Sequence, residues 1–290
     1  MSIHGVLREI SRVAHSPRMT RPLIAGSVLM LCVLMLSLIG PHLVNQQLAL
    51  VGARAPDLAP SSANWFGTDS LGRSVLAFVV DGTWPTLQIG LIAGGVGIGI
   101  GLLLGLLAGY FRGVFDATVR VLADSLLTIP QIAILVIIAA NVQQMTVNLL
   151  GLVVAILAWM VPTRTIRAQV LSMRERGYVE VARANGQREI EVLFREVLPN
   201  LIPYIAASFV GAVSAGILAA IGLEALGLGL SSAPTLGTAI YWAEKYSAVL
   251  GGEWWWWTPP IVIIAVIFLS LFLLSAGLDR LANPRIGSRA

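Results

Sequence analysis

The sequence predicts an all-α integral membrane protein with six transmembrane helices, and three observations lead to this fold class. Hydrophobic residues fill 57% of the 290 positions and charged residues only 12%, with a mean hydropathy of +0.83, whereas a soluble domain is about 25% charged. Six apolar segments match or approach the roughly 20 residues that a helix needs to cross a bilayer core. The basic residues also gather on one side of the topology that these segments define.

The six apolar segments follow one another along most of the chain. The first is too long for the apolar region of a secretory signal and lacks a clear small-residue cleavage pattern, so we interpret it as a retained span. The fourth is short, and it either extends past Arg164 or lies where the bilayer is thinned. The predicted spans are 22–44, 86–110, 117–140, 147–163, 201–222 and 259–279.

The distribution of basic residues predicts the orientation. Six spans place both termini on one side, and all but three of the 19 basic residues fall on that side; the exceptions are Arg54, Arg73 and Lys245. The positive-inside rule makes that side cytoplasmic, so the net charge of +4 needs no nucleic-acid partner. The predicted organisation is a cytoplasmic tail at 1–21, a first transmembrane helix at 22–44, an extracytoplasmic loop at 45–85, a five-helix core at 86–280 and a cytoplasmic tail at 281–290.

The second span carries glycines at strict four-residue intervals, namely Gly97, Gly101, Gly105 and Gly109. Four residues is close to one helical turn, so these glycines form one smooth stripe. Helices in lipid associate through close backbone approach at small residues. We therefore expect the stripe to face another helix, within the chain or in a partner.

Several polar or unusual residues in and near the spans have a structural and a functional interpretation. Pro130 and Pro203 each lack a backbone donor and are expected to kink or begin a helix. Asp124 is either a functional acid at membrane depth or the partner of Arg120 in an i,i+4 ion pair. The row Trp254–Trp257 is typical of an anchor at the headgroup level, with a carbohydrate-stacking platform as the alternative.

Most catalytic and metal-binding constellations are absent from the sequence. Its single lysine, Lys245, does not lie in the Gly-rich turn that a phosphate-binding loop requires. The lone Cys32 permits no internal disulfide or cysteine-based zinc cluster. We therefore expect a chain that is no enzyme and that binds no metal or cofactor of its own.

The most informative segment is the charged stretch 174–200, RERGYVEVARANGQREIEVLFREVLPN, which interrupts the apolar runs. Its Glu180, Ala182, Gly186 and Leu198-Pro199 keep the spacing of the "EAA" loop, so the segment resembles that loop in permeases of ATP-binding-cassette (ABC) importers. Val181 replaces the family's usual Ala. In that family the loop is where the membrane subunit grips its ATPase partner.

A second motif narrows the resemblance. The segment Trp65–Arg73, WFGTDSLGR, is similar to the "FGTDxLGRD" signature of the second permease subunit of oligopeptide and dipeptide importers, with Ser74 in place of Asp. Further similar stretches are 107–111, 127–130, 226–229 and Trp255-Trp256. The family often has an acid seven residues before the first Gly of the LGLG motif at 226–229; this chain has Ala220 there, and Glu224 is out of register.

The resemblance implies one half of a permease heterodimer in the bacterial inner membrane, surrounded by lipid. Its partners would be a sister permease, two ATPase subunits that bind ATP and Mg²⁺, and an extracytoplasmic solute-binding protein. The family's coupling helix maps onto Tyr178–Asn185, closed by Gly186, which suits a left-handed helix end, and Pro199 suits the start of the next helix. The implied coupling residues are Tyr178, Glu180, Ala182, Arg183, Asn185, Gly186 and Pro199.

The substrate remains open at this point. Peptides are the first expectation, and oligosaccharides or metal chelates are the alternative for the same permease role. A channel independent of any ATPase is a more distant alternative, because a channel favours a polar filter or a ring of charge in a span, and we find neither in the sequence. A purely structural membrane protein would leave the EAA-like segment unexplained.

Overall fold

The structure, a computed structural model, describes residues 21–230 and 233–282, and throughout these ranges the regular elements are helical. The longer helices are α2 (Arg21–Leu43), α3 (Val75–Phe111), α4 (Gly113–Leu127), α5 (Gln131–Ala140), α6 (Val147–Ala158), α7 (Met160–Met173), α10 (Leu198–Leu223), α11 (Leu236–Lys245) and α12 (Trp254–Ala282). The shorter elements are the 3₁₀ turn η1 (Gln46–Ala49), the helices α8 (Gly177–Ala184) and α9 (Glu189–Val192), and the π turns η2 (Leu193–Val197) and η3 (Glu224–Leu228).

The helical bundle contains the predicted number of membrane-crossing units only when bent helices are counted as pairs. Within the described ranges, four helical stretches are long and apolar enough to cross a membrane: α2, α3, the run from α9 to η3, and α12. The pairs α4–α5, bent by 81°, and α6–α7, bent by 44°, bring the number to as many as six. The segment predicted as the span 117–140 is such a bent pair: α4 ends at Leu127, and Pro130, which was expected to kink or begin a helix, directly precedes the first residue of α5.

The loop predicted at 45–85 ends earlier than expected. Helix α3 begins at Val75, and the side chain of Ser74 caps it by accepting the N–H of Ala77. Residues 75–85 are therefore helical, although Asp81 and Pro85 interrupt the apolar run that marked the span in the sequence.

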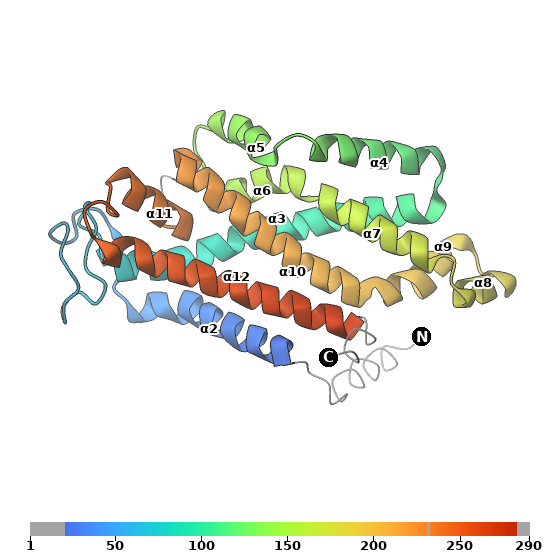
Figure 1. The fold of residues 1–290 in the computed structure, drawn as a ribbon, viewed down its shortest axis with the longest axis horizontal. Coiled ribbons are helices and arrows are strands. Elements are labelled where there is room, and N and C mark those ends of the chain that lie inside the picture. The colour runs from blue at the N-terminus through green and yellow to red at the C-terminus, as the bar shows by residue number, and fades with distance from the viewer. Residues whose placement is uncertain (1–20, 231–232, 283–290) are drawn as a thin grey trace.

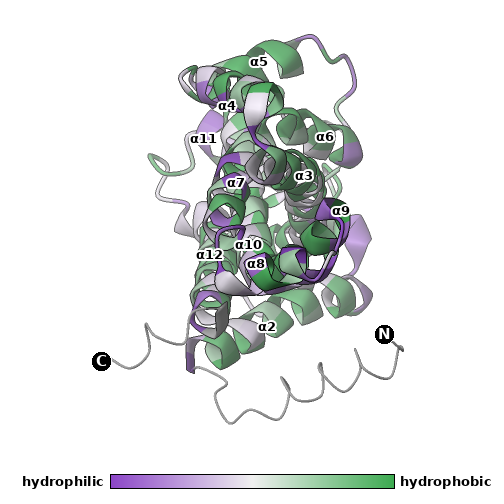
Figure 2. Ribbon diagram, turned by 90° about the vertical axis from the view of Figure 1, so that its right-hand side faces the viewer, coloured by the Kyte–Doolittle hydropathy of each residue, from purple (hydrophilic) through white to green (hydrophobic). Residues whose placement is uncertain are grey.

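Helix α3 is the central element of the bundle (Figure 1). Its 37 residues correspond to about 55 Å at 1.5 Å per residue. It packs against α2, α6, α7 and α10, while α12 covers α2 and α10. The α8–α9 segment protrudes at one end of the bundle, and α11 and the loop before α3 lie at the other end (Figure 1). Viewed from the α8 end, hydrophilic residues are frequent on α8 and α9, while α2, α3 and α12 are mainly apolar (Figure 2).

The loop before α3 is held by the Thr-Asp-Ser-Leu-Gly-Arg motif. Asp69 and Arg73 form a buried ion pair at 2.5 Å, and Asp69 Oδ1 also accepts the backbone N–H groups of Leu71 and Arg73. The Arg73 guanidinium lies 4.3 Å from the ring centroid of Phe78 at the start of α3. The motif therefore has a structural role within this chain.

The tryptophan row, predicted to be an interfacial anchor, also makes contacts within the chain. Trp254 is 56% exposed, but Trp256 is only 2% exposed and packs in the core with α2, α3 and α11. Trp255 donates its indole N–H to the carbonyl of Thr68 at 3.3 Å. The row thus joins the start of α12 to the loop before α3.

The glycine stripe of α3 lies against α6 and α7. A Cβ atom added at Gly97 would lie 2.8 Å from Ala158 Cβ, and one at Gly101 would lie 2.6 Å from Pro162 Cβ. At Gly105 and Gly109 the added atom would meet the carbonyl oxygens of α7 residues at 2.8 Å. Because real Cβ contacts are longer than this, the two backbones approach as closely as they do only where glycine is present.

We predict that Gly101→Ala destabilises the isolated chain and that Gly99→Ala, on the same helix with open space around it, does not. The added methyl at position 101 must displace α7, which costs about 1–3 kcal/mol as overpacking does in other cores. Thermal unfolding of the purified chain in detergent measures the difference. Equal melting temperatures for the two variants would contradict the close packing of α3 on α7.

Candidate functional site

Helix α8 is a short helix with a defined end. It is followed by Asn185 as its C-cap and by Gly186 at φ +79°. The Gly186 N–H bonds to the Arg183 carbonyl at 2.9 Å, and the Gln187 N–H bonds to the Ala182 carbonyl at 3.3 Å. No atom lies within 4 Å of an added Cβ at Gly186, so glycine is favoured there by its backbone conformation and not by space.

The two faces of α8 have different roles. Val179 and Ala182 are 0% and 6% exposed and pack with α7, α9 and η2 in one apolar core. Tyr178 and Val181 are 37% and 60% exposed, and Glu180 is exposed beside them. Of the seven predicted coupling residues, Tyr178, Glu180, Asn185 and Gly186 are exposed, Ala182 is buried in the core, Arg183 bonds to neighbouring helices, and Pro199 is exposed on α10.

Apolar side chains are also exposed on the elements that follow α8. Ile190 in α9 is 63% exposed and Phe194 in η2 is 52% exposed. Together with Tyr178 and Val181 they form what we call the α8–η2 face. This face lies at the polar end of the bundle, among charged residues (Figure 2).

Pro199 lies in the first turn of α10, as its motif predicted, but α10 continues directly from the preceding helical turns. The chain is helical without interruption from Glu189 to Leu228, and Pro199 is the second residue of α10 within that run. Proline cannot donate a hydrogen bond to the carbonyl four residues earlier. The preceding π turn, in which the Leu198 N–H bonds to the Leu193 carbonyl, shifts the bonding pattern just before this missing donor.

The charged cluster at the base of α8 joins four elements. Tyr110, near the end of α3, donates its hydroxyl to Glu189 Oε2 in α9, and Arg183 Nη2 in α8 donates to the same hydroxyl at 3.3 Å. Arg174, which follows α7, donates to the Tyr110 carbonyl. Sequence reasoning missed Tyr110 and Glu189, because 79 positions separate them.

Asp124 pairs differently from the prediction. Its carboxylate lies 3.9 Å from Arg164 Nη1 on α7, with both side chains half exposed or more, and not within ion-pair distance of Arg120. A tighter pair lies about two turns earlier on α4, where Arg167 of α7 binds Asp116 through two hydrogen bonds. Both acids of α4 thus face α7, which ties the bent α4–α5 pair to the rest of the bundle.

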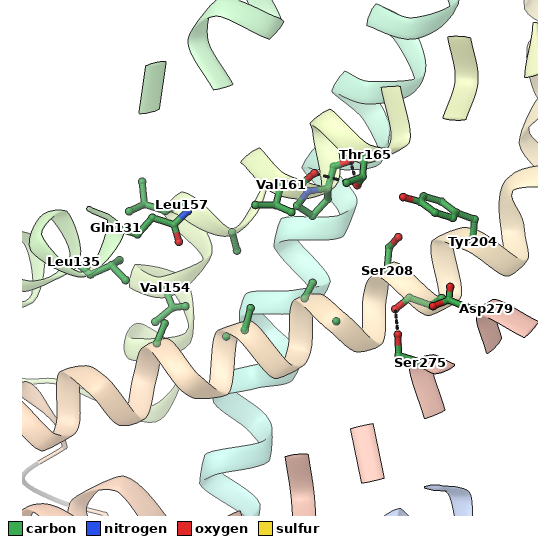
Figure 3. Close-up of a pocket in the computed structure, with 18 residues that line it drawn as sticks. Gln131, Leu135, Val154, Leu157, Val161, Thr165, Tyr204, Ser208, Ser275 and Asp279 are labelled. Carbon is green, nitrogen blue, oxygen red and sulfur yellow. Dashed lines mark hydrogen bonds between the residues drawn. The ribbon is translucent and has the colours of Figure 1, made fainter. Parts of the chain in front are cut away.

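A groove runs along one face of α10 (Figure 3). Its volume is 440 Å³, and it is bounded by α5, α6, α7 and α12. Apart from Tyr204, the α10 wall consists of small residues: Ala207, Ser208, Gly211, Ala212, Ala215, Gly216 and Ala219. Tyr204, Ser208, Ser275 and Asp279 lie at one end of the groove, and Gln131, Leu135 and Val154 lie at the other (Figure 3).

A buried acid joins the far end of α10 to α11. Glu224 is 1% exposed, and its Oε1 accepts the hydroxyl hydrogen of Thr235 at 2.6 Å. Gly229 and Gly237 lie against its side chain: a Cβ at Gly229 would be 2.8 Å from Glu224 Cγ, and one at Gly237 would overlap the carboxylate. Glu224 follows Ala220 by four residues, so the acid lies one turn further along on the same buried side of the helix.

Comparison with known proteins places this architecture in a family. Residues 101–288 match the model of the "Binding-protein-dependent transport system inner membrane component" family. The chain is 34% identical over 227 residues to the probable peptide ABC transporter permease protein y4tQ of Sinorhizobium fredii, covering 78% of this chain and 76% of that protein. It is 27% identical over 264 residues to the dipeptide transport system permease protein DppC of Bacillus subtilis, covering 90% and 81%. It is 35% identical over 172 residues to the glutathione transport system permease protein GsiD of Pectobacterium atrosepticum, covering 59% and 56%.

The bundle and its protruding α8–α9 segment thus define the transmembrane component of an importer. The chain belongs to the family of binding-protein-dependent transport system inner membrane components. It is a multi-pass inner-membrane permease subunit of an ABC importer. Members of this family are non-catalytic membrane components that work with ATPase and substrate-binding partners.

We predict that Gly237→Ala loosens α11, because the added methyl takes the space of the Glu224 carboxylate. Amide hydrogen exchange of residues 236–245 should become faster than in the parent chain, while Gly251→Ala, where the nearest atom would be 3.5 Å away, should leave it unchanged.

The double variant Glu224→Ala/Gly237→Ala isolates the contact. Glu224→Ala removes the overlap with the carboxylate and leaves only a 3.0 Å contact with the Cβ at position 224, so adding Gly237→Ala should raise exchange much less than it does in the parent chain. Additive effects of the two substitutions would contradict a direct contact between Glu224 and Gly237.

Proposed function

We propose that this chain couples ATP hydrolysis by partner ATPase subunits to the import of peptides, and that α8 is its docking element for the ATPase. The observation that carries the proposal is the α8–η2 face. Val181, Ile190 and Phe194 are each more than half exposed at the end of the bundle where charged residues exclude a lipid covering. Exposed apolar side chains among polar ones are typical of protein–protein contacts.

Energy for uphill transport must enter this chain through a protein contact. A ligand changes a conformational equilibrium only through its different affinity for the two states, and the sequence has no Gly-rich loop with a lysine to bind a nucleotide. ATP and Mg²⁺ would therefore bind to the ATPases. A pair of ATPases would serve two permease subunits, of which this chain is one and a sister permease the other.

The α10 groove supports the role of half a translocation path. Its α10 wall is made of side chains no larger than serine between residues 207 and 219, which leaves the backbone close to the open space. Polar groups lie mainly at its α8 end, with a single carboxylate, Asp279, among the lining residues. Such a surface would select little between substrates with different side chains. Relatives of the chain are named for peptide, dipeptide and glutathione transport.

The orientation of the chain can be tested directly. The distribution of basic residues predicts that the α8 end of the bundle lies in the cytoplasm. In a Cys32→Ala background, Ser247→Cys and Ala184→Cys introduce single thiols at exposed positions at opposite ends of the bundle. A membrane-impermeant thiol reagent added to intact cells should label position 247 only, and permeabilised cells should show both. Labelling of position 184 from outside would reverse the orientation and remove α8 from the ATPases.

Coupling between α8 and the ATPases can be tested by substitutions at the end and on the exposed side of α8. Gly186→Val forces a β-branched residue into positive φ, a conformation that costs an ordinary residue about 1–2 kcal/mol, and should displace the end of α8. Gly177→Val is the control, because Gly177 begins the same helix without positive φ and with open space around it. Glu180→Arg reverses a charge on the exposed side of α8.

We expect Gly186→Val and Glu180→Arg to reach the membrane but to retain less ATPase on purification, or to hydrolyse ATP without transport, while Gly177→Val behaves like the parent. ATPase co-purification and uptake into reconstituted vesicles measure both effects. Normal transport by both variants with their ATPases bound would exclude α8 as the coupling element.

A further inference from the structure

Tyr110 occupies the position where α3 meets the α8–α9 segment. It is 3% exposed, and its hydroxyl donates to Glu189 and accepts from Arg183 at 3.3 Å. The guanidinium of Arg183 also lies 5.6 Å from the ring centroid of Tyr110 and bonds to Glu189 at 3.3 Å. One phenol therefore connects α3 to both α8 and α9, and Arg183 and Glu189 are connected to each other as well.

The end of α3 is fixed to α7 on its other side. Arg174 donates to the Tyr110 carbonyl, and a Cβ at the neighbouring Gly109 would lie 2.8 Å from the Arg167 carbonyl. The close packing continues back along α3 to Gly97. A displacement imposed at Tyr110 thus has little room to be absorbed locally, because packed interiors do not deform continuously.

Helix α3 also touches the wall of the groove. A Cβ at Gly94 would lie 2.7 Å from Val213 of α10, and one at Gly216, a groove residue, would lie 2.8 Å from Ala93 of α3. Contacts therefore run without a gap from α8 through Tyr110 and α3 to the α10 groove.

We infer that the Tyr110 hydroxyl is a positioning contact that transmits displacement of α8 into α3 and so to the groove, an inference that rests on the proposed function of α8. The hydroxyl, and not the ring, is the part that matters: the ring packs in the core with Ile166 and Val170, whereas the hydroxyl alone bonds to the two charged groups of α8 and α9. A purely structural contact would change assembly and stability but not the amount of substrate moved per ATP hydrolysed.

The test uses the complete importer, with its ATPases, sister permease and binding protein, reconstituted in vesicles. Tyr110→Phe keeps the ring and removes the hydroxyl, and Tyr246→Phe removes an exposed hydroxyl beyond α11 as the matched control. We expect Tyr110→Phe to co-purify with its ATPases and to hydrolyse ATP, but to import about ten- to a hundredfold less substrate per ATP, which is the order expected for one hydrogen bond to a charged group.

Two further variants test whether the hydroxyl acts through Glu189. Glu189→Gln keeps an acceptor at the same place and should reduce the ratio of import to hydrolysis less than Glu189→Ala does. Tyr110→Phe combined with Glu189→Ala should reduce the ratio by less than the two single effects multiplied together, because both remove the same bond and each removes only one further bond to Arg183.

The outcomes separate this inference from the proposed function. A normal ratio of import to hydrolysis in Tyr110→Phe, with ATPases bound, would overturn the inference and leave α8 as the docking element. Loss of ATPase binding in Tyr110→Phe would also overturn it, because the contact would then build the docking surface. Failure of the parent chain to bind any ATPase would overturn the proposed function itself.

Discussion

The close approach of α3 to α6 and α7 is the constraint on which the rest of the structure depends. Lipid gives helices no hydrophobic reason to associate, so contact area must come from backbones that come close together. Four glycines one turn apart provide this along α3, and the contacts at Gly101 and Gly105 involve backbone atoms of α7. Since α7 leads directly into the segment that contains α8, the position of α8 relative to the bundle is set by this packing.

Two breaks in otherwise regular helices place the polar parts of the chain. The π turn η2 precedes Pro199 and lets the helix from Glu189 continue into α10 without a free end. The π turn η3 ends α10 and holds Glu224 against Gly229 and Gly237. In both turns the regular i to i−4 hydrogen-bonding pattern of the helix is interrupted. The first turn lies next to a proline that lacks a backbone donor, and the second contains a buried carboxyl group.

The sequence locates the apolar membrane-crossing segments and α8, because both depend on local pattern, but it does not predict the size of the bend between α4 and α5 or the bend between α6 and α7. Apolar length identifies a span, and a polar helix followed by Gly186 identifies α8, whose observed end at Ala184 is one residue from the predicted one. The start of α3 was missed because Asp81 and Pro85 lower the apolarity of residues that are nevertheless helical. The predicted pairing of Asp124 with Arg120 was wrong, because Arg164 comes close to Asp124 only when α4 and α7 pack together.

The groove shows why a residue pattern alone does not define a site. Ala207, Gly211, Ala215 and Ala219 recur every four residues on α10, as the glycines do on α3, and nothing local distinguishes the two stripes. On α3 the neighbouring helix fills the stripe, and a single added Cβ would collide. On α10 the same spacing borders an open groove, and a Cβ at Gly211 would meet no atom within 4 Å. Small residues permit close approach, and the arrangement of the other helices decides whether a neighbouring helix fills the space, as on α3, or a groove stays open, as on α10.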